Sequence, residues 1–160
     1  MSTATAATTM AAGNPLRPFR AILGAGLICG TLDGLSALVL SSGQFVRLFQ
    51  FIASALIGPN SFKGGAATAA LGVGLHYLIA LTATAVYYAA SRAMPILLER
   101  ALPLGVLYGI AVHLFMQFVV LPMSTLGRRP FNARSFFIYL AVHMIVVGPT
   151  IALSLRRFTR

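Results

Sequence analysis

The sequence predicts an all-α fold: a polytopic membrane four-helix bundle with one additional short interfacial or re-entrant helix. Composition gives two reasons. Of the 160 residues, 58% are hydrophobic and only 9% are charged, and the mean hydropathy is +0.88. A water-soluble domain of this size could not cover so much apolar surface with polar groups. The third reason is that the apolar residues are gathered into four long runs.

The four runs are long enough to cross a bilayer, because about 20 apolar residues span the ~30 Å hydrocarbon layer. They cover approximately residues 21–41, 65–91, 104–124 and 135–155. Short connections after the second and third runs make neighbouring helices antiparallel. Residues 1–19 are rich in Ala and Thr and are predicted to form a disordered tail. The remaining residues, 20–160, are predicted to form a single transmembrane domain.

Residues 44–57 form a separate amphipathic segment that is too short to cross the bilayer comfortably. Its polar side chains recur every three or four residues, as on one face of a helix: Gln44, Arg47, Gln50 and Ser54. This pattern suits an interfacial or re-entrant helix, with a loop helix packed on the bundle as the alternative. For the interfacial helix we expect Arg47 and Gln50 to be accessible and Phe49 and Ile52 to be protected.

The formal net charge of +10 does not indicate nucleic-acid binding, because the basic residues flank the apolar runs. There they anchor helix ends among lipid headgroups, so the predicted partner is the lipid bilayer. The side that holds both termini carries Arg17, Arg20, Arg92, Arg100, Arg156, Arg157 and Arg160. The opposite side carries Arg47, Lys63, Arg128, Arg129 and Arg134. This bias favours termini in the cytoplasm.

Each predicted span carries one ionisable side chain near its midpoint: Asp33, His76, His113 and His143. A rise of about 1.5 Å per residue places all four at one depth. A charged group at the bilayer centre costs roughly 2.5 to 3.5 kcal/mol, so these groups are expected to point into the bundle. Small residues mark the helix-packing faces: Gly26, Gly30, Gly34, Gly72, Gly105 and Gly109. We therefore predict that the four side chains meet in one shared site.

Two further residues are candidates to support this site. Gln117 lies one turn beyond His113, where it can orient the imidazole or bond to a neighbouring helix. Cys29 lies one turn before Asp33, where it can add a thiolate or serve as a small buried apolar residue.

Four interpretations of the shared site remain open. Three imidazoles and one carboxylate suit a transition metal such as Zn(II), Fe(II) or Mn(II). Intramembrane Asp and His chains also carry protons and other ions. Two of the histidines could ligate haem b, although small-residue faces pack helices too tightly for a porphyrin. In the last interpretation the groups satisfy one another within a structural or accessory subunit of a membrane complex. Metal binding or ion and proton handling is the leading prediction.

No nucleophile–base arrangement, phosphate-binding loop or dinucleotide fingerprint is found in the sequence, so no enzyme activity is predicted. The chain resembles the YagU-like uncharacterised four-span proteins of the bacterial inner membrane. The resemblance covers roughly residues 21–155 and rests on "GTLD" at 30–33, "LHYLIAL" at 75–81, "FVVLP" at 118–122 and "HMIVVGPTIAL" at 143–153. It implies a bacterial inner (cytoplasmic) membrane location and no particular activity. The small-residue faces also suit a homo-oligomer or a larger membrane complex.

Overall fold

The computed structural model describes residues 16–127 and 130–160, and this part of the chain is helical apart from short connections, with no strand. In chain order the elements are α1 (Leu16–Leu40), α2 (Phe45–Ile57), the 3₁₀ turn η1 (Gly58–Lys63), α3 (Gly65–Ala93), α4 (Ile96–Glu99), α5 (Ala101–Phe115), the π-helical turn η2 (Met116–Val120), α6 (Leu121–Met123), α7 (Ala133–Val142), the π-helical turn η3 (His143–Val147) and α8 (Gly148–Thr159).

Four helical stretches are long and apolar enough to cross a membrane, which is typical of a membrane protein. We call them span 1 (Leu16–Leu40), span 2 (Gly65–Ala93), span 3 (Ala101–Met123) and span 4 (Ala133–Thr159). They confirm the four runs predicted from the sequence. Span 1 begins earlier than predicted, because residues 16–19 already belong to the helix. Residues 1–15 of the predicted tail, together with Arg128 and Arg129, lie outside the described residues.

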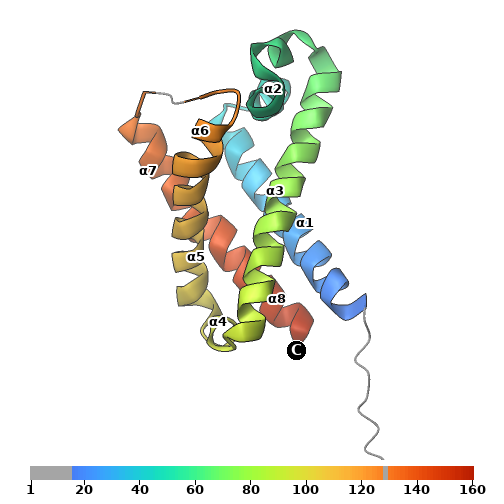
Figure 1. Cartoon of the computed structure of the whole chain (residues 1–160), viewed down its shortest axis with the longest axis vertical. Helices are drawn as coiled ribbons and strands as arrows, with labels where there is room; N and C mark the ends of the chain where they lie inside the picture. Colours follow the sequence, from blue (N-terminus) through green and yellow to red (C-terminus); the bar gives the residue numbers. More distant parts are fainter. Residues whose placement is uncertain (1–15, 128–129) are drawn as a thin grey trace, which may run out of the picture.

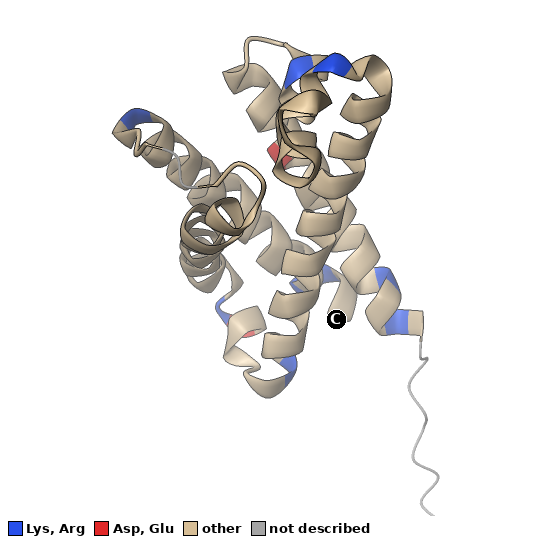
Figure 2. Cartoon of the chain, turned by 45° about the horizontal axis from the view of Figure 1, so that its top comes forward, with Lys and Arg blue, Asp and Glu red and all other residues tan. Residues whose placement is uncertain are grey.

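The spans pack in pairs around α8 (Figure 1). α8 contacts both α1 and α5, and α3 packs along α1. α7 precedes α8 in span 4 and is joined to it through the π-helical turn η3. α7 and η3 both contact α5. Basic residues lie at the two ends of the long helices (Figure 2). This distribution agrees with an apolar layer bounded by two polar ones.

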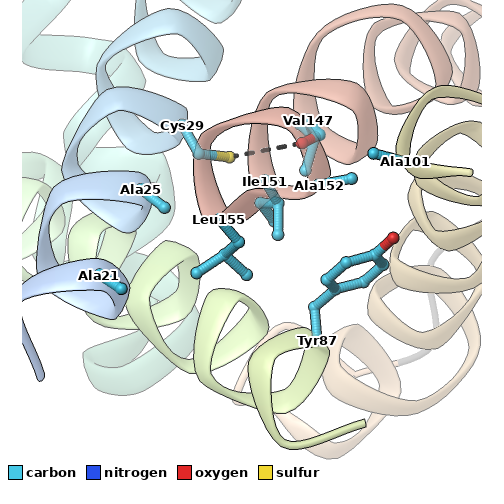
Figure 3. Packing of buried hydrophobic residues seen from close by; sticks show 9 residues of the cluster. All are labelled: Ala21, Ala25, Cys29, Tyr87, Ala101, Val147, Ile151, Ala152 and Leu155. Carbon is cyan, nitrogen blue, oxygen red and sulfur yellow. Dashed lines mark hydrogen bonds between the residues drawn. The ribbon is translucent and has the colours of Figure 1, made fainter. Parts of the chain in front are cut away.

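The buried apolar core lies at the end of the bundle where α1, α3, α5 and α8 meet (Figure 3). α8 contributes Ile151, Ala152 and Leu155, each 0% exposed. α1 contributes small side chains, which let α8 approach closely: Ala21, Ala25 and Cys29. The Cys29 thiol donates to the Val147 carbonyl oxygen at 3.8 Å. Cys29 therefore lies in the packed core between spans 1 and 4.

Spans 3 and 4 each contain a π-helical turn shortly before a proline. The Leu121 N–H donates to the Met116 carbonyl oxygen, five residues back, just before Pro122. Likewise the Gly148 N–H donates to the His143 carbonyl oxygen, just before Pro149. Proline has no N–H, and its ring clashes with the carbonyl four residues earlier, so a widened turn relieves the crowding. The turns shift the direction of the side chains on either side of them.

α2 is the predicted amphipathic helix, and it packs against α3 at one end of the molecule (Figure 1). Glycine at position 72 makes this contact possible, because a Cβ there would overlap the Phe49 carbonyl oxygen. Two residues of the polar face of α2, Gln50 and Ser54, turn inward: Gln50 is 6% exposed, and its Nε2 donates to the Gly65 carbonyl oxygen at 3.1 Å. The C-terminal half of α2 is bonded to the loop after span 3, because Thr125 Oγ1 donates to the Ser54 carbonyl oxygen at 2.5 Å.

Arg47 is exposed and Phe49 is buried, as expected for α2, whereas Ile52 is only half-buried and Gln50 is buried instead of accessible. The apolar side chains of the outer face are exposed: Phe45, Val46, Phe51, Leu56 and Ile57. The Gly65 carbonyl and the Thr68 hydroxyl at the start of α3 are hydrogen-bonding groups beside α2, and buried groups of this kind need partners. They draw the amide of Gln50 inward, while part of the apolar face packs inside with Phe49 and the rest stays exposed.

Candidate functional site

The structure joins two of the four mid-span ionisable residues and places the other two elsewhere. His113 of span 3 and His143 of span 4 lie in ring contact. His76 of span 2 instead contacts span 1 at Gly30. Anywhere in residues 16–127 and 130–160, no group of three or more His, Cys, Asp or Glu side chains is placed to hold a metal ion. The geometry thus gives no support to a four-ligand metal centre.

His76 lies between α3 and α1. Its Nε2 lies 2.7 Å from the Gly30 carbonyl oxygen and donates to it, since a carbonyl can only accept. A Cβ at position 34 would lie 3.3 Å from the same nitrogen, so glycine at this position leaves room for the ring. Phe49 and Tyr77 present their rings to the imidazole at centroid distances of 5.8 and 5.6 Å. The hydrogen bond and the aromatic contacts account for His76 as a packing residue.

Asp33 lies on α1 between two packing faces. Gly30 and Gly34 face α3, whereas Cys29 faces span 4, and the helical period places residue 33 between those directions. Its side chain is half-buried. Within the described part of the chain, the carboxylate has no hydrogen-bond or ion-pair partner. Asp33 thus lies between the two packing faces of α1 and belongs to no ligand group within the described residues.

His113 and His143 form the histidine pair of the bundle. Their ring centroids lie 5.1 Å apart at an interplanar angle of 61°. The ring of Phe136 also packs on His113, at a centroid distance of 4.8 Å. His113 is 4% exposed, and its buried Nε2 has no hydrogen-bond partner among the described residues. The Ser61 hydroxyl oxygen near α2 is also buried without a partner, but a hydroxyl does not take up a proton near neutral pH.

His143 has one nitrogen engaged and one available. Its Nδ1 lies 2.8 Å from the Tyr139 carbonyl oxygen, one turn back, and donates to it. The neutral ring therefore carries its proton on Nδ1 and leaves Nε2 as an acceptor. His143 is half-buried, in contrast to the enclosed His113. The pair thus combines one partly accessible imidazole with one enclosed imidazole.

Glycines on both helices bring the two histidines together. A Cβ at position 109 would overlap the His143 carbonyl oxygen, and one at position 148 would overlap the Gly105 carbonyl oxygen. The backbones of α5 and span 4 are therefore in direct contact, as the predicted packing role of Gly105 and Gly109 requires. A porphyrin cannot enter between helices whose backbones touch beside its supposed ligands. This closeness argues against haem b at the histidine pair.

The two candidate supporting residues lie outside the histidine pair. Gln117 is half-buried and has no hydrogen bond to any part of the structure that is described. Cys29 is 1% exposed in the apolar core. The residues that do support the pair are Tyr139, through its carbonyl, and Phe136, through its ring. In the sequence, Pro122 and Pro149 indicate that the helices near the histidines depart from ideal helical periodicity.

Comparisons with known proteins return nothing for this chain: no family model, curated protein or solved structure matches it. The YagU-like resemblance consequently stays a prediction.

Proposed function

We propose that this chain is a multi-pass protein of the bacterial inner membrane that handles protons or other ions through the pair His113 and His143. The four apolar spans support insertion into a bilayer. The apolar outer face of α2 supports its placement as an interfacial helix with that face toward lipid. The arginines near both ends of the chain support termini on the cytoplasmic side.

The observation that carries the proposal is the unpartnered Nε2 of His113. Burying a polar group without a hydrogen bond costs roughly 1 to 3 kcal/mol, so a histidine that served packing alone would be expected to have a partner. His76 has one in the Gly30 carbonyl. The free nitrogen of His113 sits beside a second imidazole, where a hydrogen bond can form once a proton is added.

The chemistry of the pair follows from two ring nitrogens, Nε2 of His113 and Nε2 of His143. Neutral His143 offers Nε2 as a proton acceptor, because Nδ1–H is held by Tyr139. A proton that arrives there forms an N–H bond and gives the ring one positive charge. Passing it to the lone pair of His113 breaks that bond, forms a new one and moves the charge. A second proton would place two like charges in contact, so the pair holds one at a time. Asp33, which has no partner among the described residues, is the carboxylate that the spans offer as a counter-charge.

Proton flux into liposomes tests the proposal. The purified protein is reconstituted with a pH-sensitive dye inside, and a potassium gradient with valinomycin sets the membrane potential. The wild-type protein is expected to acidify the lumen faster than protein-free liposomes. His113→Gln keeps a polar side chain that cannot take up a proton, so flux is expected to fall to the protein-free rate.

His76→Gln is the matched control, because an amide can still donate to the Gly30 carbonyl. Its flux is expected to stay at the wild-type rate. Helix content and gel-filtration profile establish that both variants are folded. Equal flux in the His113→Gln and wild-type proteins, or no flux above background in the wild type, would reject proton handling and favour an accessory subunit.

A further inference from the structure

Five arginines gather at one corner of the molecule, independently of the histidine pair. Arg17 and Arg20 lie in the first turns of α1, and Arg156 and Arg157 lie in the last turn of α8, with Arg160 directly after it. Figure 2 shows these basic segments side by side next to the C-terminal mark.

Contacts between α1 and α8 fix this proximity. The Arg17 guanidinium donates to the Arg160 carbonyl oxygen at 3.4 Å. One turn further in, a Cβ at position 24 would lie 3.0 Å from the Phe158 ring. The two helix ends are therefore packed together, and their arginines share one surface.

Within the described residues, no acidic side chain forms an ion pair with these arginines. The whole sequence has two acidic side chains, fewer than the arginines of the cluster. Asp33 lies well inside α1, and Glu99 ends α4, a short helix that contacts α8. Exposed like charges held this close repel one another, which favours an anion from outside the chain.

An apolar groove runs from the same end of α1 toward the middle of the spans. It has a volume of about 280 Å³ and is lined by Phe19, Ile22, Leu23, Leu81, Thr82 and Ala85. α1 supplies the first three residues and α3 the others. The groove lies at the level of the turn that follows Arg20, so a molecule with an anionic head and an apolar chain could occupy both features at once.

We propose that this corner binds an anionic phospholipid, with its phosphate on the arginines of α1 and α8 and one acyl chain in the α1–α3 groove. Basic pockets between membrane helices recognise lipid phosphates electrostatically. The arginine fork bonds phosphate oxygens in pairs. The acyl chain gains contact along the apolar groove, which gives the site a preference for a lipid over a free anion.

Native mass spectrometry of the detergent-purified full chain tests the site by counting lipid adducts. Phosphatidylglycerol is expected to bind about tenfold or more tightly than phosphatidylcholine. Raising the salt from about 0.1 M to about 1 M shortens the screening length from about 10 Å to about 3 Å and should abolish this preference, as measured by thermal stability with each lipid. Glycerol phosphate, which has the head without the chains, is expected to bind far more weakly than the lipid.

Two pairs of matched variants locate the site. Arg17→Gln with Arg20→Gln should remove the preference for phosphatidylglycerol, whereas Arg47→Gln with Lys63→Gln removes the same charge at the other end and should keep it. Ala85→Phe fills the groove and should weaken lipid binding, whereas Ala70→Phe, on an exposed part of α3, should not.

Equal binding of the two lipids by the wild-type protein would overturn the proposal without any variant. Equal losses in the two charge variants would overturn it as well, because binding would then follow net charge alone. Glycerol phosphate binding as tightly as the lipid would show an anion site without a lipid chain. None of these results depends on proton flux.

Discussion

Two regions of the bundle each place a histidine beside helix-packing glycines, but they differ in whether the buried ring nitrogen is hydrogen-bonded. In the region of spans 1 and 2, the ring of His76 lies against glycines of α1, and its N–H is bonded to the Gly30 carbonyl. In the region of spans 3 and 4, His113 lies one turn from Gly109, and its buried Nε2 has no partner among the residues that the structure describes. A histidine in a membrane helix is therefore best interpreted by where its ring nitrogens bond, not by its depth.

The helices themselves also differ between the two regions. α3 runs as one continuous α-helix from Gly65 to Ala93. Spans 3 and 4 each contain a π-helical turn, and the one in span 4 starts at His143 itself. Such turns are rare and often occur at functional sites, where they redirect a side chain. The regular region suits a packing role, and the irregular region suits a site that changes state.

The largest expected effect is on the glycine contacts, where the two regions should respond differently. Gly109→Ala is expected to destabilise the protein by about 3 kcal/mol, because its Cβ would overlap a backbone carbonyl that cannot move alone. Gly34→Ala should cost less, since its Cβ would lie 3.3 Å from the His76 side chain, which can shift. Denaturant unfolding in detergent measures both.

Gly74→Ala is the control for this comparison, because a Cβ there would meet nothing within 4 Å. It should leave stability unchanged or raise it by about 0.5 to 1 kcal/mol, as expected for replacing a glycine inside a helix. Similar losses for Gly109→Ala and Gly34→Ala would contradict the difference between the regions.

The next effect is on the histidines. His76→Leu removes the hydrogen bond to Gly30 and should destabilise the protein by about 1 kcal/mol. His113→Leu removes an unpartnered buried nitrogen and should leave stability unchanged or higher. The same unfolding measurement applies. A greater loss from His113→Leu than from His76→Leu would mean that the buried nitrogen of His113 is satisfied.

A smaller effect is expected at Asp33. Asp33→Asn keeps the size of the side chain and loses only its charge, and the carboxylate has no partner within the described residues. Stability should therefore stay within about 0.5 kcal/mol of wild type. Proton flux in liposomes should fall if this carboxylate balances the charge on the histidine pair. A large loss of stability would indicate a structural bond to Asp33 instead.

The smallest expected difference is in the histidine tautomers, and it is measured on the wild-type protein. Nitrogen-15 NMR of histidine-labelled protein at a pH where the rings are neutral should find opposite tautomers in the two regions. His76 should carry its proton on Nε2, and His143 on Nδ1, as their carbonyl partners require. Finding the Nε2–H tautomer at His143 would remove the free acceptor on which proton uptake by the pair depends.

The sequence alone determined the four spans, the amphipathic character of α2 and the glycine contact faces. Each is a local property: apolar length is matched to bilayer thickness, and helical period sorts side chains into faces. A single chain position such as Gly109 can thus be assigned to a contact before its partner is known.

Only the tertiary structure decided which groups meet. Asp33, His76, His113 and His143 are predicted to share a depth, but depth leaves the rotation of each helix undetermined. Rotation decides whether an imidazole meets a carbonyl or another imidazole. The π-helical turns near Pro122 and Pro149 add a shift that an ideal helical period does not contain. The direction of α2 was decided in the same way, because the Gly65 carbonyl that receives Gln50, at the start of α3, is brought beside it only by folding.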